Sequence, residues 1–121
     1  MTTNYNAITK QELTPRRLCA VLPKINTAAP IYTCPVGHRA VITLMEFVNT
    51  GGGAGTVRVH HVVTGETAAA SNALYYDLSI SRANTVTDDD PRFLDQGDAI
   101  YALQGTADFI AVTLYGYEVA V

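Results

Sequence analysis

RAVITLMEFVN, residues 39–49, is the stretch that decides the fold class of this 121-residue chain. It is rich in β-branched residues, which favour strands over helices. Successive side chains of a strand point to opposite faces of its sheet, and here both sets of alternate positions are apolar. We therefore predict a long strand that is covered on both faces. One face belongs to the core of the domain, and the other meets a partner subunit or the N-terminal arm described below.

The residues that follow predict a β-hairpin. TGGGAG, residues 50–55, is rich in glycine, which adopts the positive φ angles of tight turns without steric cost. TVRVHHVVT, residues 56–64, then begins by alternating between polar and apolar side chains. We expect residues 39–49 and 56–64 to pair as the two strands of this hairpin.

Further strands are expected at short intervals along the chain. Their ranges are 31–34, 74–80, 85–87, 99–104 and 109–121. No segment has the period of about 3.6 residues that marks an amphipathic helix. Roughly six to eight strands at this spacing predict an all-β fold, either an antiparallel β-sandwich or a jelly-roll-like barrel.

The first 24 residues differ from the rest and are expected to form an extended N-terminal arm, followed by a β-sandwich domain over residues 25–121. Pro15 and Pro23 oppose regular structure in the arm. The arm carries four basic residues against one acidic residue, a net +3, whereas residues 25–121 carry four against ten, a net −6. Unless this asymmetry is a chance feature of a short window, the two parts meet different partners. The apolar run 18–22 is a candidate for a first strand.

A low share of charged residues indicates that part of the surface faces other protein. Charged residues make up 16% of the chain, against about 25% in an average globular domain. In the last strand, two tyrosines fall on the face opposite to the apolar positions, and tyrosine is enriched at interfaces. We therefore expect an oligomer interface that includes Tyr115, Tyr117, Phe109, Met45 and Phe47.

The arm is expected to dock onto an acidic protein surface. Its docking residues would be Tyr5, Lys10, Arg16, Arg17 and Lys24. Nucleic acid is not an expected partner, because DNA binding needs many phosphate contacts and the acidic body would repel the phosphates.

The sequence contains no motif that predicts an enzyme. It has no G-x-S-x-G elbow, and its glycine run lacks the Lys-Ser/Thr of a phosphate loop. His60 and His61 are adjacent in a strand, so they point to opposite faces and cannot share a metal without a bulge. Asp88, Asp89 and Asp90 lack the spacing of a calcium loop and are interpreted as a solvated acidic loop. We expect no catalytic site, cofactor or metal.

Cysteine content and hydropathy restrict the protein further. Cys19 and Cys34 are too few for a disulfide scaffold, and they are either bridged to each other or, as we favour, free thiols. The polar N-terminus lacks the apolar segment of a signal peptide, and no apolar stretch is long enough to span a bilayer. We expect a protein that is made in the cytoplasm and has no membrane partner.

Several motifs between residues 31 and 119 carry a resemblance to a known class of proteins. They are T-x-P-x-x-x-R-A-V-x-T (33–43), N-T (49–50), N-A-L-x-x-D-x-S-I (72–80), L-x-x-G-D-x-I (94–100) and a closing G-x-E (116–118). In these motifs the chain resembles small β-sandwich structural proteins of bacteriophage virions, of the capsid cement or decoration type. The resemblance implies a homotrimer on the capsid surface that binds the major capsid protein and stabilises the phage head. The basic arm and the outer tyrosines of the last strand depart from the pattern.

The same resemblance leaves a second hypothesis open, because such modules also occur in tails and fibres. A tail, fibre or head-fibre module would bind a host receptor or a glycan. Exposed tyrosines can stack on sugar rings, so this hypothesis predicts a groove lined by tyrosines and acids near the loops at 65–72 and 88–95. An enzyme is the third and least supported hypothesis, since no catalytic constellation is present.

Overall fold

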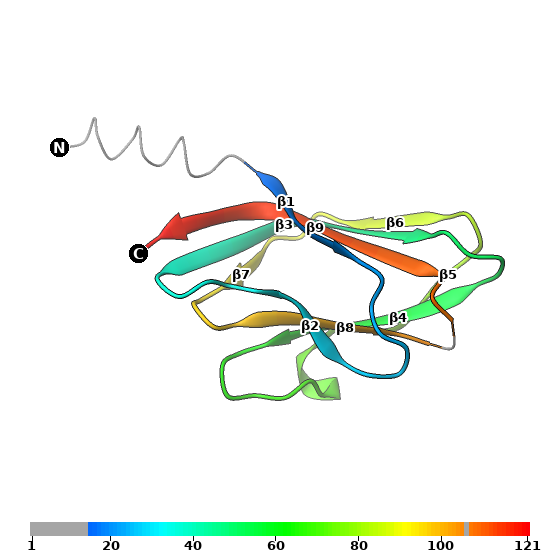
Figure 1. The fold of residues 1–121 in the computed structure, drawn as a ribbon, viewed down its shortest axis with the longest axis horizontal. Helices are drawn as coiled ribbons and strands as arrows, with labels where there is room; N and C mark the ends of the chain where they lie inside the picture. The colour runs from blue at the N-terminus through cyan, green and yellow to red at the C-terminus, as the bar shows by residue number, and fades with distance from the viewer. Residues whose placement is uncertain (1–14, 106) are drawn as a thin grey trace.

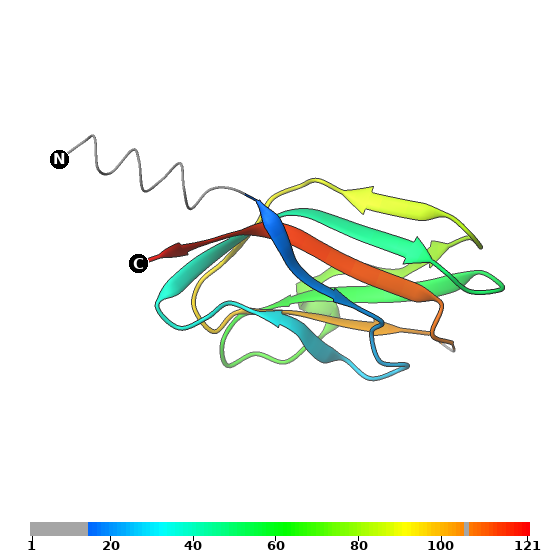
Figure 2. The same cartoon turned by 45° about the horizontal axis from the view of Figure 1, so that its top comes forward.

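Two antiparallel β-sheets pack face to face in the computed structural model, which describes residues 15–105 and 107–121 (Figure 1). Figure 2 shows β1, β9, β3 and β6 side by side in the first sheet. This is the antiparallel β-sandwich predicted from the sequence. The first sheet contains, in spatial order, β1 (Arg16–Val21), β9 (Ile110–Ala120), β3 (His38–Asn49) and β6 (Thr85–Asp88). The short strand β7 (Arg92–Leu94) also belongs to it and pairs with β3. The second sheet contains, in spatial order, β2 (Ala29–Thr33), β8 (Ala99–Gln104), β4 (Gly55–Val62) and β5 (Ala73–Ile80).

The core lies between the two sheets and follows from the alternation of side chains along the strands. In β9, Ile110, Val112 and Leu114 are fully buried, and the residues between them are half-buried on the opposite face. In β4, Val57 and Val59 are buried in the same way against the first sheet. A period of two residues therefore places one set of each strand's side chains in the core.

The predicted hairpin between β3 and β4 is wrong. These strands are consecutive in sequence, but β3 pairs with β9 and β6 in the first sheet, whereas β4 pairs with β5 and β8 in the second. The glycine-rich segment 50–54 carries the chain from one sheet to the other. The physical reason is burial, because each strand has one strongly apolar face and both faces can be buried only if they face each other across the core.

A β-bulge explains why β3 is apolar at both sets of alternate positions. The pairing register between β3 and β9 shifts between Ile42 and Leu44, which places Thr43 at the bulge. An extra residue in one strand reverses which side chains face inward. Ala40 and Ile42 are therefore buried before the bulge, and Met45 and Phe47 are buried after it.

The bulge corrects two of the predicted interface residues. Met45 and Phe47 are each 0% exposed and belong to the core cluster of the single chain. They cannot contact a partner subunit from this position. The interface prediction was wrong for these two residues because unbroken alternation along residues 39–49 would place Met45 and Phe47 opposite Ile42.

The boundary predicted at residue 24 is also wrong in part. Arg16–Val21 forms β1, which pairs antiparallel with β9 as the edge strand of the first sheet. The apolar run at 18–22 is thus a strand of the sandwich. The earlier part of the predicted arm, residues 1–14, lies outside the described residues.

Candidate interaction surface

The first sheet has a partly apolar surface that points away from the core. We call it the outer face, and Phe93 is its most exposed apolar member at 68%. Two residues that are paired across antiparallel strands project to the same side of the sheet, so the pairing register shows which residues belong to the outer face. The outer face includes Arg39, Val41, Leu44, Glu46 and Val48 in β3, Ala111, Thr113, Tyr115, Tyr117 and Val119 in β9, Phe93 in β7, Thr85 and Thr87 in β6, and Arg17 and Ala20 in β1.

Two of the predicted interface residues lie on the outer face. Tyr115 is paired with Leu44 and Tyr117 with Val41, and all four side chains are half-buried within the single chain. Their contact with a partner subunit stays a prediction. The arrangement supplies aromatic and aliphatic surface at the centre of a sheet, which suits protein–protein contact.

Phe109, the remaining predicted interface residue, packs on its own chain. Its ring lies against Gly51 so closely that a Cβ added to Gly51 would overlap the ring. The Thr50 amide donates a hydrogen bond of 2.7 Å to the Phe109 carbonyl oxygen. The half-buried Phe109 side chain therefore covers the glycine-rich segment between the sheets.

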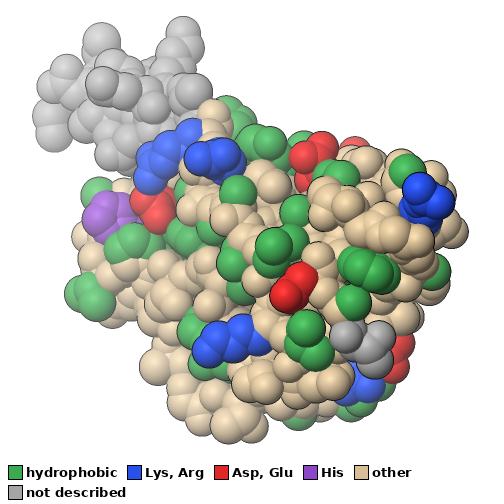
Figure 3. All heavy atoms as spheres, turned by 45° about the vertical axis from the view of Figure 1, so that its right-hand side comes forward, with side chains coloured by type: hydrophobic (Ala, Val, Ile, Leu, Met, Phe, Trp, Pro, Cys, Tyr) green, Lys and Arg blue, Asp and Glu red, His purple; other side chains and the backbone are tan. Residues whose placement is uncertain are grey.

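The predicted docking cations separate into different environments. Tyr5 and Lys10 lie outside the described residues. Arg16 forms a salt bridge of 2.6 Å with Glu118, whereas Arg17 and Lys24 are exposed and have no salt bridge to residues 15–105 or 107–121. Basic side chains gather beside the start of the described chain in Figure 3. Arg17 is thus an exposed cation on the outer face that has no salt bridge within the described residues.

A tyrosine–carboxylate hydrogen bond joins the two sheets at each edge of the sandwich. On one edge, the Tyr32 hydroxyl of β2 donates to Glu118 of β9. On the other edge, the Tyr75 hydroxyl of β5 donates to Asp88 of β6, and Arg92 also donates to Asp88 over 2.8 Å. Burial alone would raise the pKa of Asp88, but hydrogen bonds from Tyr75, the backbone amide at position 90 and Arg92 hold it below the ordinary value.

The Tyr75 contact predicts how stability changes in alkali. Burial and the hydrogen bond to Asp88 raise the pKa of Tyr75 to about 12. An unfolded tyrosine titrates near pH ~10, so the unfolded chain releases this proton first. The stabilisation is therefore complete below that pH and is lost as the pH rises toward 12. We expect Tyr75→Phe to make the fall in unfolding free energy over this range shallower, as measured by urea denaturation.

Tyr76→Phe is the matched control for this experiment. Tyr76 is the neighbouring residue, is 53% exposed and lies under the Arg58 guanidinium instead of bonding a buried carboxylate. Its substitution should leave the alkaline slope as it is in the wild type. Equal slopes for Tyr75→Phe and the wild type would contradict the assignment.

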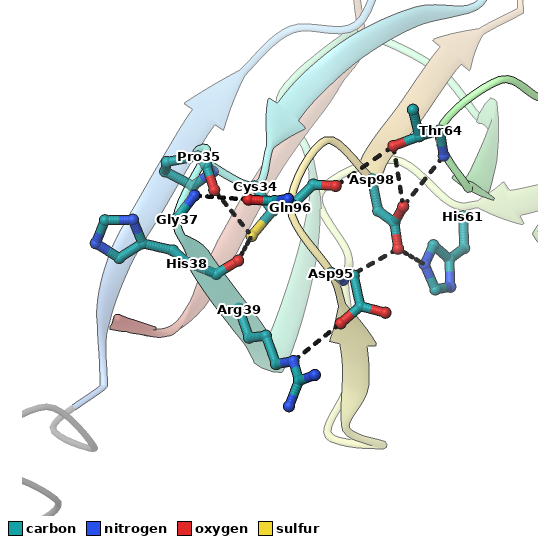
Figure 4. Close-up of polar contacts among 10 residues, drawn as sticks. All are labelled: Cys34, Pro35, Gly37, His38, Arg39, His61, Thr64, Asp95, Gln96 and Asp98. Carbon is teal, nitrogen blue, oxygen red and sulfur yellow. Dashed lines mark hydrogen bonds and ion pairs between the residues drawn. The ribbon is translucent and has the colours of Figure 1, made fainter. Parts of the chain in front are cut away.

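A polar network fixes the loops at the end of the sandwich where β2 turns into β3 (Figure 4). Asp98 is its centre. One carboxylate oxygen accepts a hydrogen bond of 3.1 Å from the Thr64 amide, and the other accepts one of 3.0 Å from the Asp95 amide. His61 Nε2 lies 4.0 Å from the same carboxylate. Because one buried acid ties two loops together, these loops form a fixed rim.

The adjacent histidines have separate surroundings, as predicted from their positions in a strand. His60 Nδ1 lies 2.9 Å from the Ala69 carbonyl oxygen, under the loop that contains the short 3-10 helix Ala70–Asn72. His61 is aligned with Ile100 on the opposite face of β4. The two rings therefore do not converge on one site.

Two hollows lie on the surface of the described residues, among others. One, of about 300 Å³, is lined by small residues and Phe109 near the ends of β4 and β5. The other, of about 240 Å³, lies beside His38, Arg39 and Asp95. Neither is lined by a tyrosine.

Within residues 15–105 and 107–121, no group of three or more His, Cys, Asp or Glu side chains is arranged to hold a metal ion. No helix of this part of the chain is long and apolar enough to cross a bilayer.

Both cysteines are free thiols. Cys34 is buried and its sulfur lies 3.3 Å from the His38 carbonyl oxygen, while Cys19 is half-buried in β1. Burial raises the pKa of both thiols, which disfavours the reactive thiolate.

Sequence reasoning missed one strand and one exposed aromatic residue. Residues 92–94 lie outside the predicted strand ranges, but they form β7 and place Phe93 on the outer face. The signal was the short apolar sequence F-L after Pro91. Three residues are too few to show alternation, so the strand could be recognised only from its pairing with β3.

Comparisons with known proteins show likeness at the level of the fold. No protein-family model matches the sequence, and no curated protein matches it. A chain of the disulfide-linked pili that form Bacillus endospore appendages aligns with a TM-score of 0.54 and 14% sequence identity, over 90% of the present chain and 88% of that chain. At this identity the likeness shows a shared fold alone.

A weaker likeness is to a chain of infectious bursal disease virus, strain Gx. The alignment has a TM-score of 0.41 and 6% identity, and it covers 88% of the present chain. The present chain spans only 30% of the length of that viral chain. This likeness is too weak to support an inference about role.

Proposed function

We propose that this protein is a structural subunit of a repeated assembly and associates with other subunits through the outer face. The observation that carries the proposal is the apolar centre of that face, where Tyr115 and Tyr117 adjoin Leu44 and Val41, with the exposed Phe93 beside them. An isolated sandwich gains nothing by leaving such a surface in water, because burial of apolar area is favourable. A structural role also agrees with the use of the same fold in the endospore pili.

The assembly would be non-covalent. The sequence has two cysteines, and both lie in described strands or loops where they are buried or half-buried. The pili of the Bacillus appendages are disulfide-linked, and this chain would differ from them in that respect. Contacts through the outer face would then depend on apolar burial and charge.

The finer proposal is a capsid cement or decoration protein on a bacteriophage head. It rests on the motifs between residues 31 and 119, whose resemblance implies a location on the capsid surface and the major capsid protein as partner. Lys24 supplies exposed positive charge for contact with an acidic shell. Many weak contacts repeated by symmetry give high avidity without a large affinity at any one site.

The test is binding to capsids that lack this protein. We expect purified chain to bind such capsids saturably, at positions related by the symmetry of the shell, as counted in cryo-EM reconstructions. Lys24→Glu should weaken binding, while Arg82→Glu, which changes an exposed cation in the turn before β6, should not. Absence of saturable binding would reject the shell role.

The alternative of a receptor- or glycan-binding tail or fibre module has less support in the described residues. The predicted groove would need tyrosines near the loops at 65–72 and 88–95, but the Tyr75 hydroxyl is bonded to Asp88. Binding of the purified chain on a glycan array would favour this alternative over the shell role.

A further inference from the structure

The outer face carries opposite charges at its two edges, at the same height along the strands. Arg17 of β1 pairs with Tyr115, and Tyr115 pairs with Leu44. On the far side of β3, Asp88 pairs with Met45 and Arg92 pairs with Ile42. The intervening residues 89–91 therefore pass alongside Leu44 and the bulge.

One edge of the outer face is positively charged and the other is negatively charged. Arg17 is exposed at one edge, and Asp89 and Asp90 are exposed at the other. In the described parts of the chain none of these three side chains takes part in a salt bridge. Three inter-strand spacings of about 4.8 Å place the two edges roughly 14 Å apart.

The row that joins these charges is apolar in the middle. Leu44 and Tyr115 lie between Arg17 and the acids, and Val41 and Tyr117 form the adjacent row. A surface with an apolar centre and a charged rim has the organisation of a protein–protein interface.

We propose that two copies of this chain pair through their outer faces, related by a two-fold axis that runs along the strands between β3 and β9. This inference rests on the proposed function and names the partner of the same surface. The rotation places β9 of one copy over β3 of the other, so Tyr115 faces the partner's Leu44 and Tyr117 faces the partner's Val41. It also places Arg17 of each copy opposite Asp89 and Asp90 of the other.

The other face-to-face arrangement is disfavoured by charge. A two-fold axis perpendicular to the strands would place β1 over β1 and the acidic segment over itself. Arg17 would then lie toward the partner's Arg17, and Asp89 and Asp90 toward the partner's acids. Like charges at an interface oppose the wrong arrangement and so fix the orientation. The pattern thus favours two copies over the three that the phage resemblance implies.

The size of the outer face sets the expected strength of the pairing. Four strands at about 4.8 Å spacing and roughly eight residues in length give on the order of 500 Å² per copy. A standard-size interface buries about 800 Å² per partner. We therefore expect a weak dimer that forms at high protein concentration.

The experiment is sedimentation velocity of the full chain from low micromolar to near-millimolar concentration. The wild type should shift from monomer to dimer. Arg17→Glu, and separately the double variant Asp89→Lys with Asp90→Lys, should each raise the dissociation constant about tenfold or more, because each creates repulsion at both rims. Circular dichroism and urea midpoints check that the variants remain folded.

Mixing the two charge variants gives the decisive measurement. In a mixed dimer, the carboxylate introduced at position 17 faces the introduced amines, and the native Arg17 faces the native acids. An equimolar mixture should therefore recover dimer that neither variant forms alone. Arg82→Glu and Asp108→Lys, exposed charges away from the outer face, are the matched controls and should leave the wild-type dissociation constant unchanged.

A further variant tests the apolar centre. Tyr115→Asp should abolish the dimer, whereas Tyr76→Asp, an exposed tyrosine on the second sheet, should not. A trimer, a dimer insensitive to Arg17→Glu, or a mixture that does not recover dimer would overturn the proposal. So would a monomer at every concentration, in which case residues 1–14 or a shell protein remain as occupants of the outer face. A monomer that still binds capsids would reject the dimer but support the shell role. A two-fold dimer that binds no capsid would support the dimer but reject the shell role.

Discussion

Gly116→Ala should lower the free energy of unfolding by about 3 kcal/mol or more, since overpacking against rigid backbone has no low-energy escape. A Cβ added to Gly116 would overlap the Val41 carbonyl oxygen and would lie 2.9 Å from the Val41 carbonyl carbon and 3.1 Å from Ile42 Cα. These are backbone atoms of the neighbouring strand, next to the bulge at Thr43. The strands would have to separate, which would break ladder hydrogen bonds between β3 and β9.

Urea denaturation followed by circular dichroism measures this effect, and Gly52→Ala is its control. A Cβ added to Gly52 meets no atom within 4 Å, so that variant should be as stable as the wild type or slightly more stable. If Gly116→Ala unfolds at the same urea concentration as Gly52→Ala, the close approach of the two strands is not a feature of the folded protein.

Gln104→Leu should cost about 4 kcal/mol, because it leaves buried backbone groups without partners. Gln104 is 0% exposed. Its amide nitrogen donates to the carbonyl oxygens of Pro23, over 2.9 Å, and Ile110, over 3.2 Å. Its amide oxygen accepts a hydrogen bond of 2.8 Å from the Ile110 amide. Leucine has a similar volume but can form none of these bonds.

This substitution would loosen two connections at once. The Gln104 side chain links the segment before β2 to the start of β9, so its loss should destabilise both. Gln96→Leu is the control, because Gln96 is exposed and accepts a single hydrogen bond from the Gly37 amide. Chemical denaturation should show a large shift for Gln104→Leu and a small one for Gln96→Leu. A small shift for both would mean that water replaces the lost partners.

The face of a regular strand could be predicted from the sequence alone. In β9 the alternation correctly separates the buried Ile110, Val112 and Leu114 from Tyr115 and Tyr117 on the outer face. The period of two residues is a local property of extended backbone, so a strand displays it whatever its partners. The all-β class and the position of the tyrosines followed from this local signal.

The candidate interface could be predicted only where alternation is unbroken. Met45 and Phe47 were assigned to the wrong face because the bulge at Thr43 reverses the alternation within β3. A bulge arises where one strand must match another of different local length, and neither sequence shows it separately. The juxtaposition of Arg17 with the acidic segment 89–91 across the outer face likewise depends on the register of four strands.

The sequence by itself determined the strand segments other than β7 and, in unbroken strands, which side chains face the core, because both depend on neighbouring residues. The tertiary structure decided which sheet each strand joins, including the separation of β3 from β4, the pairing of β7 and the inclusion of Arg16–Val21 in the first sheet. These choices minimise the apolar area left in water over the whole domain. They are made between segments far apart in the chain, where no local pattern records the partner.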